Sequence, residues 1–222
     1  MSVQTFFSST VSSNAWRVAI YVYEKGLKPE IKPVDFTTSE HKSADYLAIN
    51  PRGQVPTWKD GDIVIIESIG IMMYLEAKHV NDHNNKPLIP TKPEDLATFY
   101  TRLFQYPAKL EPTAIFGQVF FGKKGKEELR PKITDLLKEH QKWDQALQGR
   151  EYLAHTFSIA DITLIPIVTT NVELLGLGLA QFPNLEAWYK RMWARPSVKE
   201  TCPYEKAFAG LTYERVLEGE TL

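Results

Sequence analysis

The sequence predicts an α/β first half followed by an all-α second half. In the first 79 residues, short runs of strand character alternate with segments of helical spacing. Residues 81–93 are polar and contain three prolines, which is typical of a linker. Farther along, strand patterns nearly vanish and helical spacing dominates. We therefore expect a first domain over residues 1–82, a linker over 83–93 and a second domain over 94–222.

The first two strands of the predicted sheet flank a helix. Residues 3–7 and 31–36 are the strand candidates, and Pro33 places the second at a sheet edge or a bend, because proline has no N–H to donate. Residues 16–26 have helical spacing and end at a glycine. A helix between two strands favours parallel pairing through a crossover.

The third and fourth strands are predicted to form a hairpin. Residues 56–59 and 63–66 flank an Asp-Gly-Asp turn at 60–62, and Asp-Gly between apolar runs is the strongest short-range hairpin signal. Residues 41–48 add one or two helical turns before the hairpin, and 69–79 form a helix after it. The predicted order is β-α-β-α-β-β-α, with an antiparallel last pair.

The second half is predicted to be helical throughout. Residues 94–121 are long and aromatic-rich, and 126–147 carry an apolar stripe at helical spacing. Residues 158–161 (SIAD) form a variant of the capping box, in which Asp161 is a helix cap important for folding. Residues 185–194 and 198–208 complete this half.

Composition excludes several classes of protein. Hydrophobic residues make up 43% and charged residues 24%, as in ordinary globular proteins. The 26 basic and 27 acidic residues give a net charge of -1, so nothing favours a nucleic-acid or anionic-membrane partner. The single cysteine, Cys202, excludes an internal disulfide framework and suits a reducing compartment. With no signal-peptide pattern and no apolar stretch of membrane-spanning length, we expect a cytoplasmic protein.

Two residue pairs are unusual for their places in the chain. Val55-Pro56 opens a strand with a residue that cannot donate to the ladder. Glu67-Ser68 stands at the start of a helix, where unpaired N–H groups and a partial positive charge can bind a carboxylate. Ser68 is also an ordinary helix cap, but capping gives no reason for an acid before it.

Six motifs follow one another in an order that resembles the cytosolic glutathione transferases. They are SSNAWRV (12–18), EHK (40–42), NPRGQVP (50–56), DGDIVIIES (60–68), FSIADI (157–162) and FPNLEAWYKRMWARPSV (182–198). The chain resembles the serine-dependent phi, theta and zeta-like members. The resemblance implies a thioredoxin-like glutathione-binding domain, a helical bundle that carries the hydrophobic substrate site, glutathione as co-substrate, no metal, and a homodimer.

The resemblance implies a glutathione site around the two unusual pairs. The Val55–Pro56 bond would be cis, which exposes the Val55 N–H and C=O to pair with the cysteinyl amide as an added strand. Ser68 would hold the γ-glutamyl carboxylate, and Glu67 the γ-glutamyl ammonium. The alternative for Pro56 is an ordinary trans edge proline.

Three further residues match positions that contact glutathione in phi-type members. His41 and Lys42 would bind the glycyl carboxylate, which is sensible for cations. Their alternative is a solvated loop pair. Gln54 would hydrogen-bond the tripeptide from beside Val55.

The catalytic question lies in SSTVSSNAW, residues 8–16. The implied reaction needs a thiolate, whereas a free thiol with a pKa near 8.5 is only a few per cent ionised at pH 7. Lowering that pKa by about two units takes roughly 2.7 kcal/mol, and one hydroxyl hydrogen bond to an anion supplies about 1.5–3 kcal/mol. A helix N-terminus adds roughly 0.3–1 kcal/mol. The resemblance places the active hydroxyl at Ser12, with Ser13 as the second choice; the alternative is that both serines are only caps.

One departure from the family pattern bears on the class. Zeta-type members have a cysteine just after the serine pair, where this chain has Asn14. The difference argues against cysteine-dependent omega-type chemistry and weakens maleylacetoacetate isomerisation. Tyrosine-dependent classes fit less well, because no tyrosine precedes Tyr21.

Other candidate residues are less specific. The aromatic face of the second half is either core or part of the electrophile site, and we expect Phe116 and Phe120 to lie in a hydrophobic substrate pocket. His79 and His83 are four apart, but Asn81-Asp82 favours a helix end between them, so no metal site is expected.

The sequence thus favours a cytoplasmic glutathione S-transferase that uses Ser12 to conjugate glutathione to electrophilic small molecules, or to reduce hydroperoxides. A glutathione-dependent lyase similar to β-etherases, an isomerase and a non-catalytic binding or assembly module are the alternatives. The complete set of implied thiol-site residues argues against the module. The sequence leaves the electrophile open.

Overall fold

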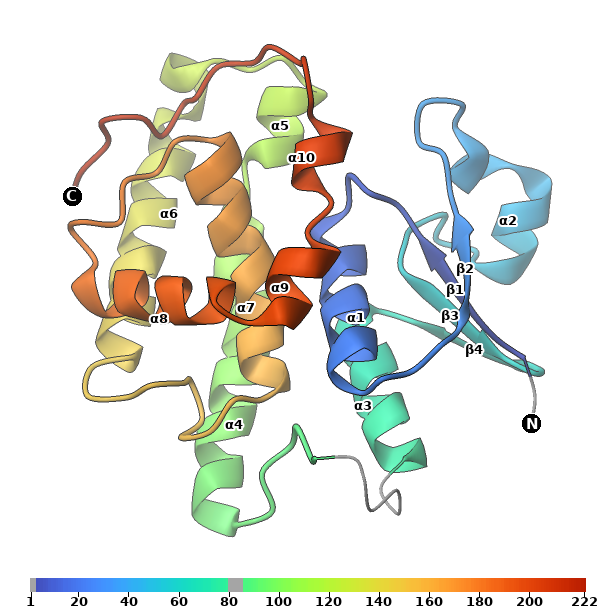
Figure 1. Ribbon diagram of the computed structural model, residues 1–222. Coiled ribbons are helices and arrows are strands. Elements are labelled where there is room, and N and C mark those ends of the chain that lie inside the picture. The colour runs from blue at the N-terminus through green and yellow to red at the C-terminus, as the bar shows by residue number, and fades with distance from the viewer. Residues whose placement is uncertain (1–2, 80–85) are drawn as a thin grey trace. The chain divides into compact units, whose positions relative to one another are not determined.

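The computed structural model describes residues 3–79 and 86–222, and the chain forms two compact units (Figure 1). The first unit runs to Pro87 and also contains Pro196–Ala209; the second contains Leu88–Arg195 and Gly210–Leu222. The expected linker at 83–93 begins outside the described residues. The segment 196–209 belongs to the first unit, although it follows the helical half in the chain.

The first unit is built on a four-stranded sheet in the order β2-β1-β3-β4. The strands are β1 (Gln4–Ser8), β2 (Glu30–Pro33), β3 (Thr57–Asp60) and β4 (Ile63–Ile66). β1 pairs in parallel with β2 and antiparallel with β3, and β3 pairs antiparallel with β4. The predicted parallel crossover and antiparallel hairpin are confirmed. β2 is an exposed edge strand, as Pro33 indicated.

Helices α1 (Ser13–Glu24) and α3 (Ser68–Lys78) pack against each other on one face of the sheet. The short helix α2 (Ala44–Ile49) lies on the other face, after a single 3-10 turn at Glu40–Lys42 (Figure 1). Aromatic and aliphatic side chains from these elements, including Trp58, are fully buried in the core. The β-α-β-α-β-β-α order of a thioredoxin-like domain is therefore complete.

Two short helices from the C-terminal part of the chain cover α1. They are α9 (Pro196–Thr201) and α10 (Tyr204–Ala207). The indole Nε1 of Trp16 donates to Thr201 Oγ1 at 2.9 Å, and its ring meets that of Tyr204 edge-on at 5.0 Å. The prediction of a single helix over 198–208 is wrong, because the helix is interrupted at Pro203.

Among the described residues, the regular structure of the second unit is helical, apart from one isolated bridge between Ala154 and Thr156. Its α-helices are α4 (Pro93–Gln105), α5 (Phe116–Phe120), α6 (Lys126–Ala146), α7 (Ile159–Thr169) and α8 (Pro183–Trp193). The aromatic-rich stretch 94–121 is not one helix, because a π-helical turn at Tyr106–Leu110 and a 3-10 turn at Glu111–Thr113 separate α4 from α5. The predicted apolar stripe of α6 is buried.

Helix α7 is buried along its whole length, and Asp161 fixes its start. One carboxylate oxygen accepts from the Leu153 N–H at 3.0 Å and from Trp188 Nε1 at 2.9 Å. The other accepts from the Ser158 N–H and hydroxyl at 3.0 and 3.1 Å. Burial raises the pKa of Asp161 to about 6, and these four donors oppose that shift. The predicted capping role is confirmed.

We expect Asp161→Asn to destabilise the protein by about 2 kcal/mol, because the amide NH₂ would face two donors in place of an acceptor. Urea denaturation measures the free energy of unfolding. Asp135→Asn, on the exposed face of α6, is the matched control and should change it by less than about 0.5 kcal/mol. Equal effects of the two substitutions would contradict the role of Asp161.

Candidate active site

The sheet register brings the predicted site segments to one edge of the sheet. Thr57, the first residue of β3, pairs with Phe7 near the end of β1 and with Ile66 at the end of β4. The loop after β1, the turn before β3 and the start of α3 therefore lie at the same edge. β2 is parallel to β1, so the loop that follows Pro33 is also there.

The turn before β3 presents the main chain of Val55. The Val55–Pro56 peptide bond is cis, as the resemblance implied. The Gln54 carbonyl is held by Asn50 Nδ2 at 2.8 Å and by the Tyr46 hydroxyl at 2.7 Å. Within the described chain, no hydrogen bond uses the Val55 N–H or C=O. This residue can therefore pair with an extended peptide.

A second loop is fitted closely against this turn. Gly53 has φ of +57°, and a Cβ there would lie 2.6 Å from the His41 carbonyl oxygen, so only glycine allows the approach. Lys42 Nζ donates to the Gly53 carbonyl at 3.4 Å. His41 stacks on Phe36 at 4.3 Å, and its Nδ1 is buried with no partner among the described residues. Both predicted carboxylate ligands thus lie beside the Val55 turn.

The start of α3 combines a strained residue with a buried hydroxyl. Glu67 precedes the helix with φ of 71° and ψ of 119°, a conformation that favours glycine. Its side chain is exposed, whereas Ser68 is only 6% exposed. The first N–H groups of α3 have no partner within the helix. Strain of this kind persists only where the surroundings hold it, and it clusters at ligand sites.

Sequence reasoning missed Arg17, which is only 2% exposed. Its Nη1 donates to Ser68 Oγ at 3.2 Å, which connects α1 to the start of α3. The signal was present in WRVAIYV, where an arginine interrupts the apolar face of a helix.

The two candidate serines lie at the start of α1. Ser12 is the N-cap residue, and its Oγ accepts from the Ala15 N–H at 3.2 Å. Ser13 is the first helical residue, and both are half-buried. A hydroxyl has one donor and two acceptor positions, so capping leaves the Ser12 proton available to an anion. The cap and the catalytic hypothesis are compatible.

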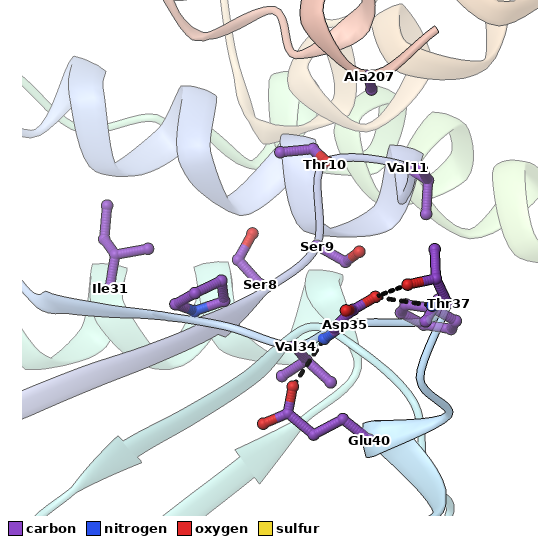
Figure 2. Close-up of a pocket in the computed structure, with 12 residues that line it drawn as sticks. Ser8, Ser9, Thr10, Val11, Ile31, Val34, Asp35, Thr37, Glu40 and Ala207 are labelled. Atoms are coloured by element: carbon purple, nitrogen blue, oxygen red, sulfur yellow. Dashed lines mark hydrogen bonds between the residues drawn. The ribbon is translucent and has the colours of Figure 1, made fainter. Parts of the chain in front are cut away.

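A cavity of about 490 Å³ lies next to this loop (Figure 2). It is lined by residues 8–11, by Ile31 and residues 33–37, by Glu40 and by Ala207, all in the first unit. Figure 2 shows the Asp35 carboxylate bonded to Thr37, whose N–H and hydroxyl both donate at 2.7 Å. The Thr37 hydroxyl lowers the pKa of Asp35, so this carboxylate is negative at neutral pH. The size suits a small organic molecule.

The aromatic candidates form a cluster in the second unit. Phe116 and Phe120 stack in α5 with ring centroids 5.4 Å apart, and Tyr213 meets both rings edge-on. Both phenylalanines are half-buried. Their assignment to the electrophile pocket stays a prediction.

Among the described residues, no group of three or more His, Cys, Asp or Glu side chains is arranged to hold a metal ion. His83 lies outside the described residues, so its suggested pairing with His79 is not described. In the same part of the chain, no helix combines the length and apolar character needed to cross a membrane.

Two family models match the chain. Residues 2–77 match "Glutathione S-transferase, N-terminal domain", and residues 94–196 match "Glutathione S-transferase, C-terminal domain". The chain is 32% identical over 200 residues to glutathione S-transferase A of Pleuronectes platessa, covering 86% of this chain and 88% of that protein. It is 30% identical over 214 residues to glutathione S-transferase 3 of Zea mays, covering 90% and 94%.

A solved structure shares the whole fold. The crystal structure of poplar glutathione transferase F1 aligns with a TM-score of 0.84 and 26% identity, covering 93% of this chain and all (100%) of that one. The thioredoxin-like sheet, the helical second unit and these matches define a two-domain glutathione-dependent enzyme. The chain belongs to the glutathione S-transferase family, and the predicted resemblance to phi-like members fits.

The strain at Glu67 leads to a prediction about stability. Glu67→Gly should be more stable than Glu67→Ala by about 1 kcal/mol, because glycine adopts positive φ without the strain of roughly 1–3 kcal/mol. Urea denaturation of the two variants tests it. The same pair at Lys138, an exposed helical position, is the control and should show the opposite order. The idea fails if alanine is the more stable residue at position 67.

Proposed function

We propose that this glutathione transferase ionises the thiol of glutathione with the Ser12 hydroxyl. The observation that carries the proposal is the geometry of the cap: Ser12 Oγ accepts from the Ala15 N–H, so its proton is free to point outward. The start of α1 adds the partial positive charge of a helix N-terminus. Together, a hydroxyl donor and a helix end can stabilise a thiolate without a general base.

The same proposal assigns the remaining contacts of glutathione. The unpaired N–H and C=O of Val55, before Pro56, bind the cysteinyl amide. Ser68 and the N–H groups of α3 hold the γ-glutamyl carboxylate, and Glu67 holds the ammonium. Gln54 hydrogen-bonds the tripeptide from the same turn.

At the other end of the tripeptide, His41 and Lys42 bind the glycyl carboxylate. Their proximity to Gly53 supports this assignment, because the Lys42 ammonium and the His41 main chain both lie against the turn that binds the cysteinyl residue. The buried and unpartnered His41 Nδ1 adds a polar atom that a ligand can satisfy.

The thiolate then attacks an electrophilic carbon. In a substitution, a sulfur–carbon bond forms and the leaving group departs with its electron pair. In an addition to an activated double bond, the sulfur–carbon bond forms as the π bond opens, and the resulting carbanion takes a proton. The cavity beside Val11 supports this step, because apolar side chains of Val34 and Phe36 line part of it. With a hydroperoxide, the thiolate attacks the terminal oxygen, the O–O bond breaks, and the alcohol leaves after taking a proton. The thiol of a second glutathione then attacks the resulting sulfenic sulfur, which forms the disulfide and releases water. The competing functions are a glutathione-dependent lyase, an isomerase and a non-catalytic binding module. Activity assays on a panel of electrophiles, with and without glutathione, distinguish them.

We expect Ser12→Ala to raise the pKa of the bound thiol by about 1–2 units, because one hydrogen bond to an anion is worth about 1.5–3 kcal/mol. A pH titration of thiolate ultraviolet absorbance in the glutathione complex measures it. At pH 7 the conjugation rate should fall roughly 3- to 25-fold, in proportion to the smaller fraction of thiolate. Glutathione affinity, measured by calorimetry, should change little, because the other contacts remain.

Ser13→Ala is the matched control for this experiment, since Ser13 begins the same helix without capping it. It should leave the thiol pKa unchanged. A large effect of Ser13→Ala with none from Ser12→Ala would show that Ser13, and not Ser12, supplies the catalytic hydroxyl. No heat with several millimolar glutathione and wild-type protein would refute the whole proposal.

The assembly expected for this chain is a homodimer. Met72 of α3 is fully buried, whereas Met73 is partly exposed and offers an adaptable apolar contact. On α4, Tyr100 and Phe104 are stacked, and 40% and 54% exposed. Light scattering at micromolar concentration should give about 50 kDa, twice the 25.4 kDa of one chain. A mass near one chain, in protein that still binds glutathione, would contradict the dimer.

The cytosol is the location that we propose for this enzyme. The single cysteine, Cys202, forms no disulfide and suits a reducing compartment, which also keeps glutathione in its thiol form. Cell fractionation with a tagged chain tests this location.

A further inference from the structure

Arg17 is a charged residue in an apolar setting. It lies in the middle of α1 and is 2% exposed, among neighbours such as Trp16 and Val18 that are equally buried. Taking a guanidinium out of water is costly unless its donors are satisfied. An apolar residue of similar length would fill the space without this cost. The charge therefore calls for an explanation beyond packing.

The hydrogen bond to Ser68 has a fixed direction. A guanidinium has five N–H donors and no acceptor, so Arg17 Nη1 must donate and Ser68 Oγ must accept, at 3.2 Å. The Ser68 O–H must then point away from Arg17. Across residues 3–79 and 86–222, no hydrogen bond gives that proton an acceptor. Ser68 is only 6% exposed, so little water can replace one.

The Ser68 hydroxyl and the first turn of α3 thus present donors. The Ser68 hydroxyl proton joins the first N–H groups of the helix, which have no partner within it. Arg17 supplies a permanent positive charge directly behind the hydroxyl oxygen. A set of convergent donors backed by a cation fits a carboxylate and disfavours a neutral or cationic group.

We propose that Arg17 is the positioning residue of the γ-glutamyl carboxylate subsite: it holds Ser68 so that the hydroxyl proton faces the ligand, and its charge strengthens that hydrogen bond. The inference rests on the proposed binding of glutathione at α3. Arg17 does not touch the ligand in this account; it acts through Ser68. The competing explanation is that Arg17 only joins α1 to α3.

A pair of ligands separates the two explanations. Glutathione has the γ-glutamyl α-carboxylate, whereas 4-aminobutanoyl-cysteinylglycine is the same tripeptide without it. Calorimetry gives the affinity of each ligand for wild type and for Arg17→Met. We expect Arg17→Met to weaken glutathione binding about 10- to 100-fold and the analogue by less than about 3-fold. In steady-state assays the KM for glutathione should rise, with kcat at saturating glutathione nearly unchanged.

Tyr21→Phe is the matched control. The Tyr21 hydroxyl donates to Glu76 at 3.2 Å, which also joins α1 to α3 but away from Ser68. Tyr21→Phe should lower the stability of the protein without changing the ratio of its affinities for glutathione and the analogue. Arg17→Lys keeps the charge and should retain part of the preference for glutathione, and it provides the same comparison if the methionine variant does not fold. In a Ser68→Ala background, replacing Arg17 should have little further effect on that preference.

The results have distinct meanings. Equal loss of both ligands in the Arg17 variants, or no loss of either, would overturn the positioning role and leave only a structural one. A selective loss of glutathione supports it. Failure of wild type to bind glutathione would instead refute the proposed function, and the wild-type titration shows this before any variant is made.

Discussion

The backbone hydrogen bonds that β1 makes on both of its sides decide where the loops of the candidate site lie. Its parallel pairing with β2 and antiparallel pairing with β3 place the end of β1 beside the start of β3. Antiparallel β4 then returns to the same edge, so α3 begins there as well. The loops after β1 and β2, the turn before β3 and the start of α3 therefore meet because of these strand pairings. Side chains refine this arrangement but do not create it.

The site that results is made mainly of donors. The first main-chain N–H groups of α1 and α3 have no hydrogen-bond partner within their helices. Ser12 and Ser68 add hydroxyl protons at the same two helix N-termini. Such groups need no pKa adjustment and are rigid because the helices are rigid. An anion, whether a thiolate or a carboxylate, is the chemical species that these groups stabilise best.

Local patterns predicted most of the first unit and helix α6 of the second, because each of these elements carries its own signal. The Asp-Gly turn, the proline in the edge strand and the buried stripe of α6 needed no knowledge of distant contacts. The return of Pro196–Ala209 to the first unit could not be predicted, since periodicity shows which face of a helix is apolar but not what covers it. Arg17 was missed for the same reason: its partner Ser68 is 51 residues away in the chain.

The covering of α1 by that returning segment has a consequence for how the chain folds as it is made. Trp16 is synthesised early, but its partners Thr201 and Tyr204 come almost at the end. During synthesis the sheet and its helices can form long before this face of α1 is closed. A broad indole surface therefore stays open while the second unit is translated. The first unit therefore begins to fold before the second. Its contacts between Trp16 and the segment 196–209 form only near the end of synthesis.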